Sequence, residues 1–254
     1  MPDRGRVSLV GAGPGDPGLV TLDALDRLRK ADLVIYDRLV GKGVLDLIPR
    51  GVRKVYGGKK PGSGGNEEQR MLNELMVDEA MSGKRVVRLK GGDPFLFSRG
   101  GEEAVYLLDH GVDFEVVPGL SSALAVPAYA GIPLTHRKYS SSVTVVTGRE
   151  AGSKRRVDWS KLAEGSDVVV VLMGAAKIGE FAKRLIDGGK PAKTPVAAIM
   201  NGTTKGQKTV VTTLGEAAKR GARALGIEPP AVIVVGRVVS LRRRLNWARE
   251  DAKR

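Results

Sequence analysis

The chain contains no cysteine and only two histidines, His110 and His136. The absence of cysteine excludes disulfides, a thiolate nucleophile, and zinc or iron–sulfur sites with cysteine ligands. With so few histidines, a histidine-rich metal centre is not expected either. The sequence therefore predicts chemistry that needs no bound metal.

Long apolar segments and aromatic residues are also scarce. A run such as Val168–Ala176 is far too short to cross a bilayer, and Met1–Arg6 leads into a predicted strand without a signal-peptide core. We therefore expect a cytoplasmic protein with no membrane partner. Aromatic residues make up 4% of the chain, which argues against a stacking surface for single-stranded nucleic acid.

Basic residues are in clear excess. The chain has 42 lysines and arginines against 28 acidic residues, a net charge of +14. Such an excess predicts a polyanionic partner, either nucleic acid or a small molecule with many carboxylates or phosphates. Ion-pair networks of a heat-adapted protein are a structural explanation for part of the same excess.

The first half of the chain alternates predicted strands with predicted helices. This alternation favours a largely parallel sheet with helices on both faces. A further helix, Ser121–Tyr129, is rich in small residues. The strands are predicted at Arg6–Val10, Leu33–Tyr36, Arg53–Tyr56, Arg85–Leu89 and Asp113–Val117, and the helices at Leu19–Lys30, Glu67–Ser82 and Gly101–His110.

The polar, proline-marked segment Gly131–Ser142 is the best place for a domain boundary. We predict an α/β protein of two αβα domains, residues 1–136 and 137–254, with mostly parallel sheets and an active-site cleft between the domains. The second domain has predicted strands at Val143–Thr147, Val168–Met173, Val196–Met200, Thr209–Thr213 and Val232–Val235, and predicted helices near Ala176–Asp187, Leu214–Ala224 and Leu241–Ala252.

The strand that begins at Val86 breaks at Gly91-Gly92-Asp93-Pro94. A paired glycine at the C-terminal end of a strand lets the backbone approach a ligand closely, and such ends bind small ligands in open α/β sheets. Asp93 could accept hydrogen bonds from ligand hydroxyls. A tight turn without any ligand is the alternative interpretation.

A second glycine-rich loop, Gly13–Gly18, matches the G-x-G-x-x-G pattern of dinucleotide-binding folds. Asp37, after the second strand, stands about where a ribose-binding acid would be. However, Pro14 and Pro17 remove two of the backbone donors that a phosphate cradle needs. We therefore expect the loop to turn beside an uncharged or cationic ligand.

A series of sequence segments in this chain resembles those of the tetrapyrrole methylases, and within that family those of the members that act on uroporphyrinogen III. They follow one another in family order over nearly the whole chain, from Val7 to about Trp247. The matching segments are Val10–Leu22, Val34–Val40, Gly57–Lys60, Arg88–Phe97, Arg99–Glu103, Val117–Ala123, Ala128–Arg137, Leu172–Gly174, Pro195–Thr203 and Pro230–Gly236.

This resemblance implies a homodimer that uses S-adenosylmethionine as methyl donor and makes S-adenosylhomocysteine. It also implies Asp37 as proton acceptor and Lys59 as proton donor. Taken alone, Asp37 fits a strand-end turn and Lys59 a surface lysine. The implied donor pocket consists of Pro14, Gly91, Gly92, Asp93, Leu96, Ser121, Ser122, Met173 and Gly202, of which Met173 taken alone fits a core position.

The implied reaction is methylation of uroporphyrinogen III at C2 and C7 to give precorrin-2, on the way to sirohaem and cobalamin. A sulfonium is a good leaving group, so the enzyme has to align the reactants, exclude water and manage one proton. Because the substrate carries many carboxylates, we expect it to contact a set of polar and basic residues: Arg38, Lys60, His136 and Arg137.

An RNA methyltransferase is the competing hypothesis, prompted by the net charge and by the basic segment Leu241–Arg249. Ribosomal-RNA methylases and diphthine synthase are the relevant relatives within the same fold family. We instead expect this segment to form an amphipathic closing helix with Leu241, Leu245 and Ala248 inward, and no nucleic-acid partner.

Overall fold

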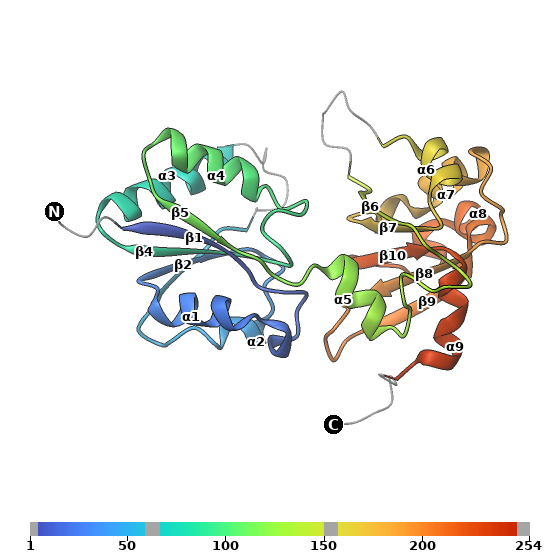
Figure 1. Cartoon of the computed structure of the whole chain (residues 1–254), viewed down its shortest axis with the longest axis horizontal. Coiled ribbons are helices and arrows are strands. Elements are labelled where there is room, and N and C mark those ends of the chain that lie inside the picture. The colour runs from blue at the N-terminus through green and yellow to red at the C-terminus, as the bar shows by residue number, and fades with distance from the viewer. Residues whose placement is uncertain (1–4, 59–66, 150–156, 248–254) are drawn as a thin grey trace. The chain divides into compact units, whose positions relative to one another are not determined.

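The computed structural model describes residues 5–58, 67–149 and 157–247. The chain forms two compact units, Met1–Ser121 and Ser122–Arg254 (Figure 1). Helix α5 (Ser122–Tyr129) belongs to the second unit because its buried residues pack on the second sheet. The predicted boundary between residues 136 and 137 therefore falls inside the second unit.

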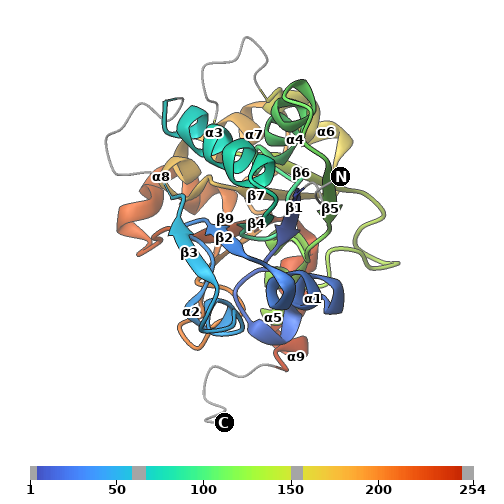
Figure 2. The same cartoon turned by 90° about the vertical axis from the view of Figure 1, so that its left-hand side faces the viewer.

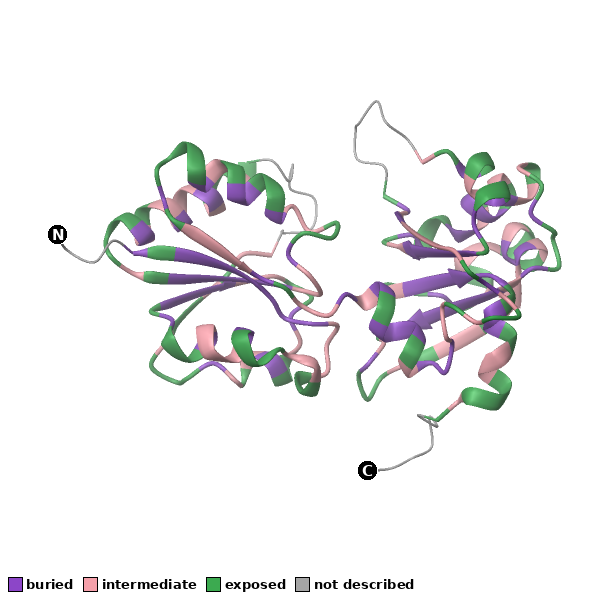
Figure 3. Ribbon diagram, viewed as in Figure 1, coloured by how far each residue is buried: buried purple, intermediate pink, exposed green. Residues whose placement is uncertain are grey.

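The first unit is built on a five-stranded parallel sheet with the order β3-β2-β4-β1-β5. Its central strands are buried on both faces, as their β-branched runs predict (Figure 3). The strands are β1 (Arg6–Gly11), β2 (Leu33–Tyr36), β3 (Arg53–Tyr56), β4 (Arg85–Lys90) and β5 (Phe114–Val117).

Helices cover both faces of this sheet (Figures 1 and 2). A short 3-10 helix, η1 (Pro17–Leu19), precedes α1 (Leu22–Lys30), which begins where the Thr21 hydroxyl accepts a hydrogen bond from the backbone N–H of Ala24. Helices α1 and α2 (Lys42–Leu45) pack on one face, and α3 (Glu67–Met81) and α4 (Gly100–Asp109) on the other.

The second unit has a mixed sheet with the order β6-β7-β10-β8-β9, in which only β6 and β7 pair in parallel among the described strands. The predicted α/β class with two sheets is confirmed, but only the first sheet is all-parallel. The connection 201–207 between β8 and β9 is too short for a crossover, so these strands form an antiparallel pair. The strands are β6 (Val143–Thr147), β7 (Val168–Leu172), β8 (Pro195–Met200), β9 (Lys208–Thr213) and β10 (Ala231–Val235).

Three helices pack on one face of this sheet: α6 (Trp159–Gly165), α7 (Ile178–Asp187), which follows the 3-10 helix η2 (Ala175–Lys177), and α8 (Leu214–Ala224). Helix α5 and the 3-10 helix η3 (Arg237–Leu241) pack on the other face.

The C-terminal helix is shorter than predicted. Helix α9 spans Arg242–Leu245, the Leu245 side chain is exposed rather than inward, and Ala248 lies outside the described residues. Throughout 5–58, 67–149 and 157–247, helices with the length and hydropathy of a membrane span do not occur.

Candidate functional site

Three loops meet at the C-terminal edge of the first sheet, beyond β1, β4 and β5. Gly13 and Gly92 form a backbone bridge, with N···O distances of 3.2 and 2.7 Å. A Cβ on Gly11 would lie 2.4 Å from the Cα of Gly119, and a Cβ on Gly119 would lie 2.3 Å from the carbonyl oxygen of Gly92. These positions therefore accept only glycine, and they leave backbone atoms lining this edge of the sheet.

Asp93 connects two of these loops. One carboxylate oxygen accepts a hydrogen bond from the backbone N–H of Phe95 at 2.8 Å, and the other accepts one from the N–H of Gly119 at 3.1 Å. A carboxylate has further lone pairs, so this arrangement leaves room for a ligand hydroxyl. Asp93 is thus a structural connector as well as a predicted ligand contact.

Asp37 follows β2, next to the place where the chain connections from two adjacent strands, β2 and β4, turn to opposite faces of the sheet. The chain leaves β2 toward β3 through α2 on one face, and it leaves the adjacent strand β4 toward β5 through α4 on the other face. The backbone N–H of Asp37 donates to the carbonyl of Leu89 at 3.2 Å and so continues the β2–β4 ladder. Ligands of open α/β sheets bind in the crevice that such a switch in direction creates.

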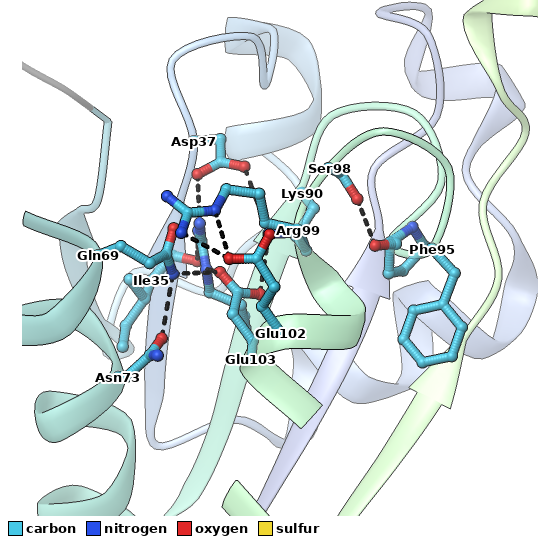
Figure 4. A network of polar contacts seen from close by, with 12 residues as sticks. Ile35, Asp37, Gln69, Asn73, Lys90, Phe95, Ser98, Arg99, Glu102 and Glu103 are labelled. Atoms are coloured by element: carbon cyan, nitrogen blue, oxygen red, sulfur yellow. Dashed lines mark hydrogen bonds and ion pairs between the residues drawn. The ribbon is translucent and has the colours of Figure 1, made fainter. Parts of the chain in front are cut away.

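A buried cluster of charged side chains contacts Asp37 (Figure 4). Arg88 donates from Nη2 to one oxygen of Asp37 at 2.5 Å and from Nε to Glu103 at 3.1 Å. Lys90 donates to the second oxygen of Glu103 at 2.8 Å and lies 4.0 Å from Asp37. Arg88, Lys90 and Glu103 are 3, 1 and 0% exposed, whereas Asp37 is 28% exposed.

The protonation states within this cluster follow from burial and from the neighbouring charges. Burial alone would raise the pKa of Glu103, but the charges of Arg88 and Lys90 outweigh it and hold that pKa below its ordinary value. The pKa of Lys90 lies below its ordinary value. Burial is the largest cause, and the charge of Arg88 is the second. Glu103 is therefore an ionised carboxylate that two cations hold in the interior.

In the second unit, Met173 and Gly202 follow β7 and β8. Both strands run antiparallel to β10, so their carboxyl ends lie at the same edge of the sheet. Met173 has a positive φ of 54° and a side chain that is 49% exposed, so it does not fill the core. A Cβ on Gly202 would lie 2.4 Å from the side chain of Val126 in α5. Because Gly202 has no side chain, α5 can pack closely against the loop after β8.

The other predicted donor residues are distributed over both units. Pro14 is half-buried, Leu96 is 37% exposed on the loop before α4, and Ser121 is buried ahead of Ser122, the first residue of α5. Exposed Phe95 accompanies Leu96 on that loop.

Among the predicted substrate contacts, Arg38 and Arg137 are exposed. His136 is held by its own loop, because its Nδ1 accepts a hydrogen bond from the backbone N–H of Lys138 at 3.2 Å and its ring lies 5.0 Å from that of Tyr139. Lys59 and Lys60 lie outside the described residues.

Sequence reasoning did not single out Arg88, Lys90 and Glu103 as a group. One feature of the sequence could have revealed this group: two basic residues, at alternate positions 88 and 90, lie in a strand that is mostly apolar. Alternate residues of a strand face the same side, so two cations there need an anionic partner from the covering helix.

Comparison with known proteins places the chain in a family. The profile of the tetrapyrrole (corrin/porphyrin) methylases matches residues 6–218. Siroheme synthase 2 of Yersinia enterocolitica is 45% identical over 247 residues, and siroheme synthase of Chromobacterium violaceum is 48% identical over 248 residues. Each alignment covers 97% of this chain but only 51% and 52% of those proteins, so the chain spans about half their length.

A solved structure has the same fold along its whole length. Uroporphyrin-III C-methyltransferase from Thermus thermophilus, complexed with S-adenosylhomocysteine, superposes with a TM-score of 0.81 at 40% identity. The match covers 93% of this chain and 100% of the Thermus chain. On these grounds the chain belongs to the tetrapyrrole (corrin/porphyrin) methylase family.

Proposed function

We propose that this chain transfers methyl groups from S-adenosylmethionine to C2 and C7 of uroporphyrinogen III and so makes precorrin-2 for sirohaem synthesis. The observation that carries the proposal is the position of Asp37, a partly exposed carboxylate where the connections from β2 and β4 diverge, in a chain 40% identical to the Thermus methyltransferase. The names of the relatives further support sirohaem synthesis.

The residues at the edge of the first sheet fit a nucleoside donor. Gly11 and Gly119 let the loops after β1, β4 and β5 approach so closely that a Cβ on either would meet backbone, and Asp93 holds two of these loops together. Pro14 and Gly91 extend this lining, and we assign Leu96 and Ser121 to the same donor-binding set. In the second unit we assign Ser122, Met173 and Gly202. When bound, S-adenosylmethionine supplies an electrophilic methyl group on a sulfonium.

Asp37 accepts the proton in this proposal. A pyrrole carbon that gains a methyl group becomes part of a cation, and the ring regains its neutral form when it loses a proton to a base. Asp37 is a carboxylate at the C-terminal end of β2, and Arg88 donates a hydrogen bond to one of its oxygens. Lys59 is the proton donor that the family resemblance implies.

Basic side chains hold the substrate in this proposal. The exposed residues Arg38 and Arg137 can pair with its carboxylates, and His136 presents its remaining ring nitrogen, Nε2. We add Lys60 to this set from the sequence. The homodimer implied by the resemblance belongs to the same proposal.

The test is anaerobic incubation of the protein with S-adenosylmethionine and uroporphyrinogen III, followed by mass analysis of the product. We expect two added methyl groups. A parallel incubation with ribosomal RNA and transfer RNA tests the competing activity. Methylated RNA together with an unchanged porphyrinogen would contradict the proposal.

A further inference from the structure

The proposed chemistry leaves unexplained why the chain buries Arg88, Lys90 and Glu103. Removing three charges from water is energetically costly, and ion pairing only partly offsets this cost. Apolar residues would suit these positions, because β4 is a central strand whose other buried members are Val86, Val87 and Leu89. Replacing such clusters with hydrophobic residues is often neutral or stabilising. The presence of this cluster in the core therefore indicates a role beyond stability.

The geometry of the cluster is directed at Asp37. Asp37 alone among its four charged members reaches the surface. Arg88 binds one oxygen of Asp37. Within the part of the chain that the structure describes, the nearest charged group to the other oxygen is Lys90 at 4.0 Å, which is beyond hydrogen-bonding distance. Among the described residues, that second oxygen is the one left to accept a proton.

We infer that Arg88, anchored by Glu103, is a positioning residue that fixes the Asp37 carboxylate so that its second oxygen receives the proton that the methylated, cationic ring releases. This inference rests on the proposed function. In the step, the methylated carbon is bonded to four carbons and has no hydrogen, so a C–H bond breaks at the bridging carbon attached to the cationic ring. Its electron pair forms a C=C bond to the ring and neutralises the iminium, and the proton goes to Asp37.

The surrounding elements hold Arg88 in one orientation. Its guanidinium also lies 3.4 Å from the carbonyl of Ile35 on β2. Gln69 on α3 donates to the Glu103 oxygen that Arg88 uses, at 3.0 Å, and to Asn73 at 3.0 Å (Figure 4). A planar guanidinium can bridge Glu103 and Asp37 at once, whereas a lysine ammonium is a point charge.

A double-mutant cycle tests whether Arg88 acts through Asp37. The variants are Arg88→Gln, Asp37→Asn and the two combined, each assayed for kcat of methyl transfer and, by calorimetry, for affinity toward S-adenosylhomocysteine. We expect Arg88→Gln to lower kcat roughly 10- to 100-fold with donor affinity within about twofold. In the Asp37→Asn background, it should lower kcat by less than about twofold further.

Lys190→Met is the matched control for loss of a buried cation. Lys190 is buried in the second unit and donates only to the backbone carbonyls of Ala163 and Ser166 among the described residues. We expect it to lower thermal stability while kcat stays the same. If Arg88→Gln does not fold, Arg88→Gln/Glu103→Gln removes one charge of each sign, and its kcat should fall by a similar factor.

The outcomes separate this inference from the proposed function. A wild-type protein that leaves uroporphyrinogen III unmethylated would overturn the proposed function. An active wild type with independent, additive losses for Arg88 and Asp37, or with an unchanged kcat in Arg88→Gln, would overturn the positioning role. A near-normal rate for Asp37→Asn would remove Asp37 as the base, and the positioning role with it.

Discussion

The carboxylate of Asp93 accepts a hydrogen bond at 3.1 Å from the backbone N–H of Gly119, which lies 26 residues further along the chain. This bond joins the loop after β4 to the loop after β5. At the same place, Gly119 approaches the carbonyl of Gly92 so closely that a side chain cannot fit. The edge of the sheet therefore depends on backbone contacts, and substitutions there have strong and specific effects.

Gly119→Ala should disrupt this edge, because the new Cβ would lie 2.3 Å from one backbone oxygen and 2.6 Å from the Cα of Gly11. We expect a loss of affinity for S-adenosylhomocysteine of at least tenfold, measured by calorimetry, and a lower melting temperature. Gly101→Ala is the control, because nothing lies within 4 Å of its Cβ position in α4. It should be neutral or stabilise by about 0.5–1 kcal/mol. Equal donor affinity in both variants would contradict the prediction.

Asp93→Ala should destabilise the first unit by roughly 1–3 kcal/mol, because two backbone N–H groups lose a charged acceptor. Chemical denaturation measures this effect. Donor titration then separates the two roles of Asp93. A variant that loses stability and keeps full donor affinity would limit Asp93 to joining the loops.

Asp37→Asn should slow methyl transfer by roughly 10²–10⁴, since an amide cannot accept the proton that a carboxylate can. The loss should appear in kcat, while affinity for S-adenosylhomocysteine stays nearly the same. Single-turnover assays with uroporphyrinogen III measure it. If the rate stays normal, Asp37 serves only to end β2.

Glu103→Gln should lower the free energy of unfolding by about 3–5 kcal/mol at pH 7, because Arg88 and Lys90 lose their buried anion. The folded protein holds the pKa of Glu103 below its ordinary value, so on acidification the unfolded chain takes up the proton first. Stability from Glu103 is therefore present at neutral pH and lost as the pH falls through that lowered pKa.

The difference between wild type and Glu103→Gln should thus shrink as the pH falls below about 4.5, in denaturation curves recorded at several pH values. The neighbouring Glu102→Gln is the control. Glu102 is 61% exposed and pairs with Arg99 at the surface, so its effect should stay below about 1 kcal/mol. A pH-independent difference for Glu103→Gln would refute this account.

Gly202→Ala should loosen the contact between α5 and the loop after β8, because the new Cβ would lie 2.4 Å from Val126. We expect a cost of about 1–3 kcal/mol from overpacking. Adding Val126→Ala should recover part of the loss, because it removes the clashing methyl groups. Double-mutant analysis of melting curves measures this coupling.

Much of the fold could be predicted from local patterns. The β-branched runs predicted the strands of both sheets to within about two residues, and the ordered motifs predicted the family, which the comparisons confirmed. Helices α2 and α6 were not predicted, because they have 4 and 7 residues and carry too few turns for an apolar period. The antiparallel pairs of the second sheet were not predicted either, because strand pairing is a non-local choice.

The sequence by itself determined where backbone approaches closely and which residues are candidates for the chemistry: the glycine loops, Asp93 and Asp37. Only the tertiary structure decided their partners. Arg88 and Glu103 are 15 residues apart, and Arg88 and Asp37 are 51 apart, yet they form one buried cluster. The physical reason is that a buried charge requires an opposite charge nearby, and the packing of α3 and α4 on β2 and β4 decides which residue supplies it.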